Sequence, residues 1–177
     1  MPGTGVSSTS LSPGPLAEGT DRVQLLGLPL DRCTRDQALD RCGLAAASHG
    51  PPLRVVTLNP EMVVRAGRDP ALFDAIRGAG LVLPDGMGIA WAARRLGVEV
   101  PERIAGADFL PDLARLAAER GLGLFLLGGR PGVAAAAGQR LVRDHPGLRL
   151  VGAWPGSPAP AEAAEICQRV EAAGAAV

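Results

Sequence analysis

The chain has 177 residues, of which 47% are hydrophobic, so it is long enough to bury one globular core and too short to support two. Its 18 basic and 18 acidic residues cancel, aromatic residues make up only 3% of the chain, and tyrosine is absent. We therefore expect no nucleic-acid partner, because the sequence offers neither a block of basic residues nor platforms for base stacking.

Cysteine usage and hydropathy predict a cytoplasmic protein. Cys33, Cys42 and Cys167 are odd in number and lie outside any C-x-x-C pattern, which fits neither a disulfide framework nor a zinc site. No apolar stretch approaches the roughly 18 to 20 residues of a membrane span. The N-terminus also lacks the charged segment and apolar core of a signal peptide.

The chain changes character after its first twenty residues. Residues 1–20 are dominated by glycine, serine, threonine and proline, which predicts a disordered tail. From residue 21 onward, β-like runs alternate with helical segments, and this pattern indicates one α/β domain over residues 21–177, with a mainly parallel sheet flanked by helices. The predicted strands are residues 23–28, 53–58, 81–83, 122–127 and 148–151.

Local signals mark where the first helices begin. Thr34 and Gln37 fit a capping box that opens a helix to about residue 48. Asn59 and Asp69 each precede a proline, and a good N-cap followed by proline is typical of a helix start. Two consecutive helices are therefore predicted between the second and third strands.

The second half of the chain continues the same alternation. Apolar residues recur at helical spacing over residues 107–120, and Gly121 is placed to end that helix. Residues 122–127 are then predicted to form a central buried strand. A last helix is expected over residues 160–173, and residues 174–177 resemble the opening of another strand.

Polar residues follow two of the predicted strands. Thr57 and Asn59 close one apolar run, and Asp85 with Gly86 closes the next. In α/β sheets ligands bind outside the carboxyl ends of the strands, so these residues are candidates for a site. Taken alone, each residue also fits a structural role, since Asn59 and Asp85 are good helix caps and Arg103 can pair with Glu102 on the surface. Their clustering at strand exits favours a pocket for a charged ligand.

A glycine-rich turn follows the predicted strand 122–127. Gly128, Gly129 and Gly132 bring bare amides to the start of a helix, a geometry that suits a phosphate group. The spacing matches neither the dinucleotide fingerprint nor the P-loop, and a turn that needs positive φ explains the glycines equally well. Both interpretations stay open.

The chemistry that best fits these residues is transfer from a nucleotide-diphosphate donor. Such a transferase needs a base for the acceptor hydroxyl and cationic or amide groups for the departing diphosphate, roles that Asp85 and Arg103 match. No D-x-D sequence occurs that could chelate a metal on the donor. A metal-independent reaction without a cofactor is therefore predicted.

Five linked motifs resemble the WecG/TagA/CpsF family of glycosyltransferases over roughly residues 23–157. The motifs lie at residues 57–61, 83–88, 102–108, 125–129 and 145–148. The resemblance implies a Rossmann-like fold and a bacterial, inverting enzyme that moves a sugar, typically of the N-acetylmannosamine type, from a UDP donor to a membrane-held polyprenyl-diphosphate saccharide.

The resemblance also implies roles for individual residues. Asp85 matches the proposed catalytic base of the family, and Arg103 matches a basic residue near the substrate. The other residues expected to bind substrate are Thr57, Asn59, Gly86, Gly128 and Gly129. A cytoplasmic protein at the inner face of the plasma membrane follows from the acceptor, and the sequence leaves a homo-oligomer open.

Family members usually continue into a further strand with a Gly-x-Pro-x-Gln-Glu motif and a helical appendage. Neither is present in these 177 residues, so we expect a chain that lacks both. The alternative function is a nucleotide-binding module without turnover, inactive because of this truncation. A dinucleotide-dependent oxidoreductase is disfavoured, because the first predicted strand leads into Pro29 to Arg32 and not into a glycine-rich turn.

Overall fold

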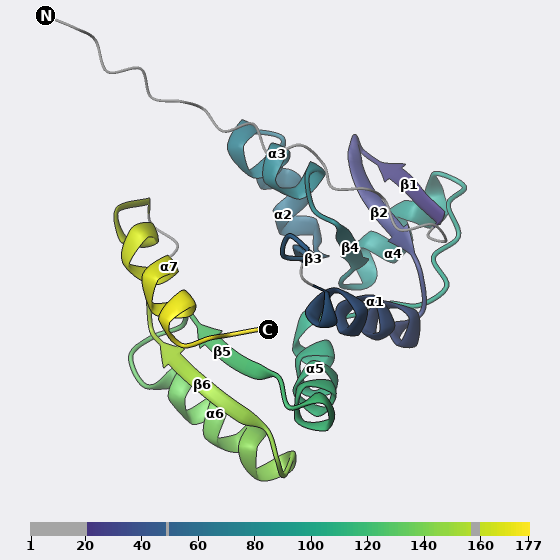
Figure 1. The fold of residues 1–177 in the computed structure, drawn as a ribbon. Helices are drawn as coiled ribbons and strands as arrows, with labels where there is room; N and C mark the ends of the chain where they lie inside the picture. The colour runs from purple at the N-terminus through teal and green to yellow at the C-terminus, as the bar shows by residue number, and fades with distance from the viewer. Residues whose placement is uncertain (1–20, 49, 157–159) are drawn as a thin grey trace, which may run out of the picture. The chain divides into compact units, whose positions relative to one another are not determined.

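The computed structural model describes residues 21–48, 50–156 and 160–177 (Figure 1). Within these ranges the chain forms two compact units. The first includes residues 21–34 and 53–104, and the second includes residues 35–52 and 105–177. The predicted tail, residues 1–20, lies outside the described residues, and a single domain over residues 21–177 stays a prediction.

The first unit opens with an antiparallel hairpin, where the sequence predicts one strand over residues 23–28. β1 (Asp21–Leu25) pairs with β2 (Leu28–Arg32) across a two-residue turn. Leu26 and Gly27 have φ values of 52° and 81°, and two consecutive positive φ values give the turn whose twist matches such a hairpin. The prediction of one strand is therefore wrong. The sequence did not indicate the turn because leucine is not a typical turn residue.

A parallel strand pair follows in the first unit. β3 (Val55–Leu58) pairs with β4 (Leu81–Pro84), and α2 (Pro60–Ala66) and α3 (Pro70–Arg77) connect them as predicted. Both predicted N-caps are confirmed, since Asn59 Oδ1 accepts from the Met62 amide at 2.9 Å and Asp69 Oδ1 accepts from the Leu72 amide at 3.1 Å. Two residues, Asp85 and Gly86, lie between the end of β4 and the start of α4 (Met87–Arg95).

One carboxylate is fully buried in the first unit. Asp31, on β2, accepts from Arg22 Nε at 2.9 Å and from Arg22 Nη2 at 2.7 Å. It also accepts from the Val82 amide at 2.6 Å. The amides of Leu81 and Asp85 donate to carbonyls of the β3 segment, on one edge of β4. The Val82 amide points to the opposite edge, so Asp31 lies on the edge of β4 that faces away from β3. The ion pair lies within the hairpin, and the hydrogen bond from the Val82 amide to Asp31 joins the hairpin to β4.

Apolar side chains from the hairpin, both parallel strands and three helices form the core around this ion pair. They are mostly leucine, isoleucine, valine and alanine, as the scarcity of aromatic residues requires. The buried members are Leu25, Leu28, Leu30, Leu58, Ala66, Ile76, Ala79, Val82, Ile89 and Ala93.

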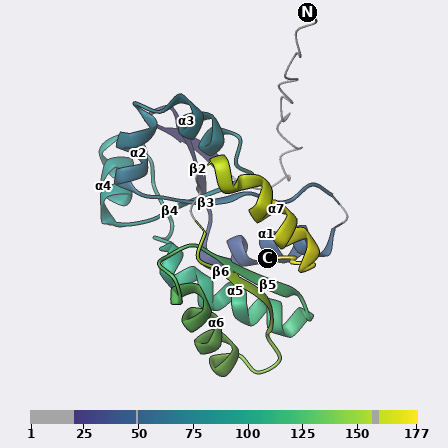
Figure 2. The ribbon, with the colours of Figure 1, turned by 90° about the vertical axis from the view of Figure 1, so that its left-hand side faces the viewer.

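The second unit contains the other parallel pair. β5 (Gly123–Leu127) pairs with β6 (Arg149–Trp154), and α6 (Val133–Asp144) packs along both strands (Figure 2). α1 (Arg35–Ala47) and α5 (Gly106–Arg120) contact each other, and α5 ends at Gly121, whose φ is 65°. A short 3-10 helix, η1 (Pro160–Glu162), and α7 (Ala163–Ala172) replace the single predicted last helix.

β5 has hydrogen-bonded neighbours on both edges, but its C-terminal end is not buried. The Phe125 amide donates to the Val177 carbonyl at 2.9 Å, and the Val177 amide donates to the Gly123 carbonyl at 3.1 Å. The last residues thus add to β5 as the opening of a strand would. The prediction of a fully buried strand is wrong for its end, because Leu127 is 47% exposed.

The predicted α/β class is confirmed. The strands form three two-stranded sheets, two of them parallel, with helices alongside. This arrangement is consistent with a Rossmann-like fold. None of the helices in the described ranges is long and apolar enough to cross a membrane.

Candidate functional site

Two parallel strands of the first unit end side by side, and the predicted site begins there. Thr57 pairs in register with Leu83, and Leu58 pairs with Pro84. The amide of Asp85 donates to the Leu58 carbonyl at 2.9 Å, one residue past the end of β4. The strand ladder therefore continues far enough to fix the backbone of Asp85 against β3.

Asp85 and Gly86 form the step from β4 into α4. Both residues are partly buried, and Gly86 occupies the N-cap position of α4 with a φ of 85°. Glycine adopts this φ without steric strain, which explains the residue at this position. Asp85 precedes the N-cap, at the carboxyl end of β4 where the sequence predicts a base.

The starts of α2 and α4 lie against each other. A Cβ atom added at Gly88 would come within 2.6 Å of Cγ of Pro60, the first residue of α2. Only a glycine lets the two helices approach so closely. The positive ends of both helix dipoles therefore lie at the same strand ends as Asp85.

Asn59 has a structural role that the sequence left open. Its side-chain oxygen caps α2 through the Met62 amide, which leaves its amide nitrogen as the group that could donate to a ligand. The cap is confirmed, and a contact with substrate stays a prediction.

Removing the Asn59 side chain tests its role as the cap of α2. Asn59→Ala should lower the free energy of unfolding by about 0.5–2 kcal/mol, because an amide of the first turn of α2 loses its acceptor. Asn59→Asp keeps an acceptor oxygen and should unfold close to the wild type. Urea denaturation measures both, with Asp69→Ala as a matched loss of the α3 cap. Wild-type stability of Asn59→Ala would contradict this role.

A loop of the first unit brings Arg103 to the same end of β4. The Ile104 amide donates to the Pro84 carbonyl at 2.9 Å, so the backbone next to Arg103 is tied to the residue before Asp85. Arg103 itself is exposed. The structure thus brings Thr57, Asn59, Asp85 and Arg103 to one edge, as the strand-exit argument predicts.

The glycine turn belongs to the second unit. Gly128 and Gly129 follow β5 with φ values of 115° and 77°, and Gly132 begins α6 with a φ of 88°. The Gly128 amide donates to the Trp154 carbonyl at 2.9 Å, so it serves the ladder between β5 and β6. The turn therefore needs its glycines for conformation, and their role with a nucleotide stays a prediction.

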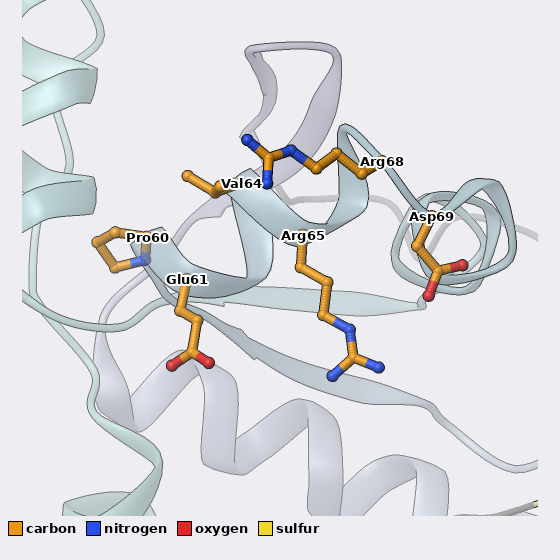
Figure 3. A pocket seen from close by; sticks show the side chains of 6 residues that line it. All are labelled: Pro60, Glu61, Val64, Arg65, Arg68 and Asp69. Atoms are coloured by element: carbon orange, nitrogen blue, oxygen red, sulfur yellow. The ribbon is translucent and has the colours of Figure 1, made fainter.

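A shallow depression of about 500 Å³ lies along α2 and is lined by Pro60, Glu61, Val64, Arg65, Arg68 and Asp69 (Figure 3). Glu61 and Arg65 project to one side of the helix, and Val64 and Arg68 project to another. None of the predicted site residues lines it. A second depression, of about 390 Å³, is lined by residues 90, 94 and 97–100.

The Arg22–Asp31 pair is not among the predicted residues, although Asp31 bonds to the β4 amide of Val82. The local signal of a buried acid is an aspartate that directly follows the apolar residues 28–30 of β2. In the described ranges, no group of three or more His, Cys, Asp or Glu residues is arranged to hold a metal ion.

Known proteins with similar sequences indicate which kind of protein has these residues. A model of the glycosyl transferase WecG/TagA/CpsF family matches residues 23–177. Two curated relatives, from Bacillus spizizenii and Bacillus subtilis, are each named N-acetylglucosaminyldiphosphoundecaprenol N-acetyl-beta-D-mannosaminyltransferase. They are 32% and 28% identical to the chain over 98 residues. The match covers 55% of this chain but only 38% of each relative.

Proposed function

The chain belongs to the WecG/TagA/CpsF family of glycosyl transferases, and we propose that it moves a sugar of the N-acetylmannosamine type from a UDP donor to a polyprenyl-diphosphate-linked saccharide. The product would enter cell-envelope polysaccharide or teichoic acid synthesis. The names of the two Bacillus relatives support the sugar and the lipid-linked acceptor. The enzyme would work at the inner face of the plasma membrane, where such acceptors are held.

The observation that carries this proposal is the position of Asp85. Its backbone is bonded to the end of β3, and the loop with Arg103 is bonded to the end of β4. A carboxylate and a guanidinium are thus mounted at the edge where α/β proteins bind ligands. This is the pairing of a base and a cation that transfer from a nucleotide diphosphate requires.

The proposed reaction is a single displacement. The carboxylate of Asp85 accepts the proton of the acceptor hydroxyl while the hydroxyl oxygen attacks the anomeric carbon from the face opposite UDP. The new C–O bond forms as the bond to the UDP oxygen breaks, and UDP leaves with the electron pair. The configuration at the anomeric carbon inverts. Arg103 and amides at the helix starts stabilise the charge on the departing diphosphate, without a metal.

A transfer assay tests the proposal. The chain is incubated with UDP-N-acetylmannosamine and a short-chain, soluble diphosphate-linked N-acetylglucosamine, and the disaccharide product is followed by mass spectrometry. We expect product at the same rate with and without EDTA. A rate abolished by EDTA and restored by Mg²⁺ would disprove metal independence.

Calorimetry with UDP distinguishes the remaining outcomes. UDP binding without transfer would favour a nucleotide-binding module. A folded chain that neither binds UDP nor transfers sugar would disprove the proposed function.

A further inference from the structure

The helix that follows Asp85 presents large apolar side chains to solvent. On α4, Met87 is 75% exposed and Trp91, one turn later, is 66% exposed. The opposite side of the helix already fills the core, since Ile89 is 2% exposed and Ala93 is fully buried. Packing of the first unit therefore does not account for the tryptophan.

Arginines lie beside these apolar side chains, and Arg94 lines the second depression together with the exposed Glu99. α4 contains no acidic residue, and its last turn ends in Arg94 and Arg95, both exposed. Leu96, which follows directly, is 55% exposed. Arginines at a helix C-terminus complement the helix dipole, but this role does not explain Met87 and Trp91 beside them. Leu96 is nine positions after Met87 and so lies on another side of the helix, and we call the exposed residues Met87, Trp91, Arg94 and Arg95 the α4 face.

From this combination we propose that the α4 face binds the surface of an anionic lipid bilayer. Tryptophan and other apolar side chains of an interfacial helix enter the boundary between headgroups and acyl chains, and arginines bind anionic headgroups. A second copy of the chain fits less well, because a symmetric contact would bring the two arginine pairs together.

The α4 face lies close in the chain to the candidate base, so a membrane contact there would serve catalysis. This step rests on the proposed function. Met87 is two residues beyond Asp85, which is at most roughly 7 Å of backbone. A bilayer that takes up Met87 and Trp91 therefore lies close to the candidate base. The lipid of a diphosphate-linked acceptor is anchored in that bilayer, so binding of the α4 face would bring the acceptor sugar near the base.

Vesicle binding tests the α4 face without any sugar chemistry. The chain is mixed with vesicles of phosphatidylcholine alone or of equal phosphatidylcholine and phosphatidylglycerol, and bound protein is separated by flotation. We expect binding to the anionic vesicles that weakens in 0.5 M salt. Met87→Gln with Trp91→Gln should weaken it roughly tenfold or more, and Arg94→Gln with Arg95→Gln should have a similar effect.

Leu44→Gln is the matched control. Leu44, on α1, is 70% exposed, so its substitution removes an exposed apolar side chain elsewhere and should leave vesicle binding unchanged. The chain has two tryptophans. In a Trp154→Phe background Trp91 is the sole fluorophore, and its emission should shift to the blue and be quenched by brominated lipid.

Three results would overturn the proposal. These are no binding to anionic vesicles, binding unaffected by the α4 variants, and a lipid-free dimer that the Met87 and Trp91 substitutions convert to monomer. Failure of the proposed function is distinguishable. Vesicle binding without transfer to the soluble acceptor leaves the α4 face standing, and transfer to the soluble acceptor without vesicle binding removes the α4 face alone.

Discussion

Asp85→Asn should lower kcat for sugar transfer by about 10²–10⁴-fold, the usual loss when a positioned general base is removed. Asparagine has nearly the same shape as aspartate but cannot accept the acceptor's proton. The backbone amide of residue 85 keeps its bond to the Leu58 carbonyl, so the strand ends should keep their arrangement. The rate is measured at saturating UDP-sugar and soluble acceptor.

Two measurements distinguish a loss of the chemical step from a loss of folding or of donor binding. UDP binding by calorimetry should stay near the wild-type affinity, because in the proposed reaction the base contacts the acceptor hydroxyl and not the nucleotide. Asp74→Asn, an exposed substitution on α3 of the same unit, should retain full activity. If Asp85→Asn transferred sugar at the wild-type rate with folding intact, the base would be another group.

Asp31→Ala should lower the free energy of unfolding by about 3–5 kcal/mol, because it leaves the arginine of a buried ion pair without its partner. Asp31 is fully buried and the Arg22 side chain is only 17% exposed. The substitution also strips the Val82 amide of its acceptor. Urea denaturation at neutral pH measures the change, and Asp31→Asn serves if the alanine variant does not fold.

A neighbouring ion pair on the same hairpin provides the control. Arg32 pairs with Asp21, whose side chain is 63% exposed, so Asp21→Ala should change stability by no more than about 1 kcal/mol. Replacing both buried partners, as in Arg22→Met with Asp31→Leu, should recover part of the loss, because no isolated charge remains. Equal stability of Asp31→Ala and Asp21→Ala would show that the buried carboxylate of Asp31 does not hold the hairpin to β4.

Local chemistry explains what the sequence could predict. Asn59 and Asp69 cap the helices that follow them, because capping depends on residues only three positions apart. Asp85 was placed correctly at a strand exit, since a buried apolar run and the turn after it are contiguous in the chain. The hydrogen bond from the Ile104 amide to the Pro84 carbonyl holds the backbone next to Arg103 at the same edge.

What the sequence could not predict depends on distant partners or on unusual backbone. Asp31 is buried because its partner amide at Val82 lies 51 residues away, and no periodic pattern encodes that contact. The hairpin turn was missed because Leu26 adopts a φ that glycine or asparagine normally adopts. Whether Asp85 acts as a base depends on a bound acceptor, which no sequence pattern represents.

The contact between Gly88 and the ring of Pro60 has a consequence for ligand affinity. With no side chain at residue 88, the first turns of α2 and α4 pack directly against each other, and the strand ends next to them are hydrogen-bonded to each other. A ligand that binds at this edge therefore meets amides and side chains that are already ordered. Less conformational entropy is lost on association, so a larger part of the contact energy is left for affinity.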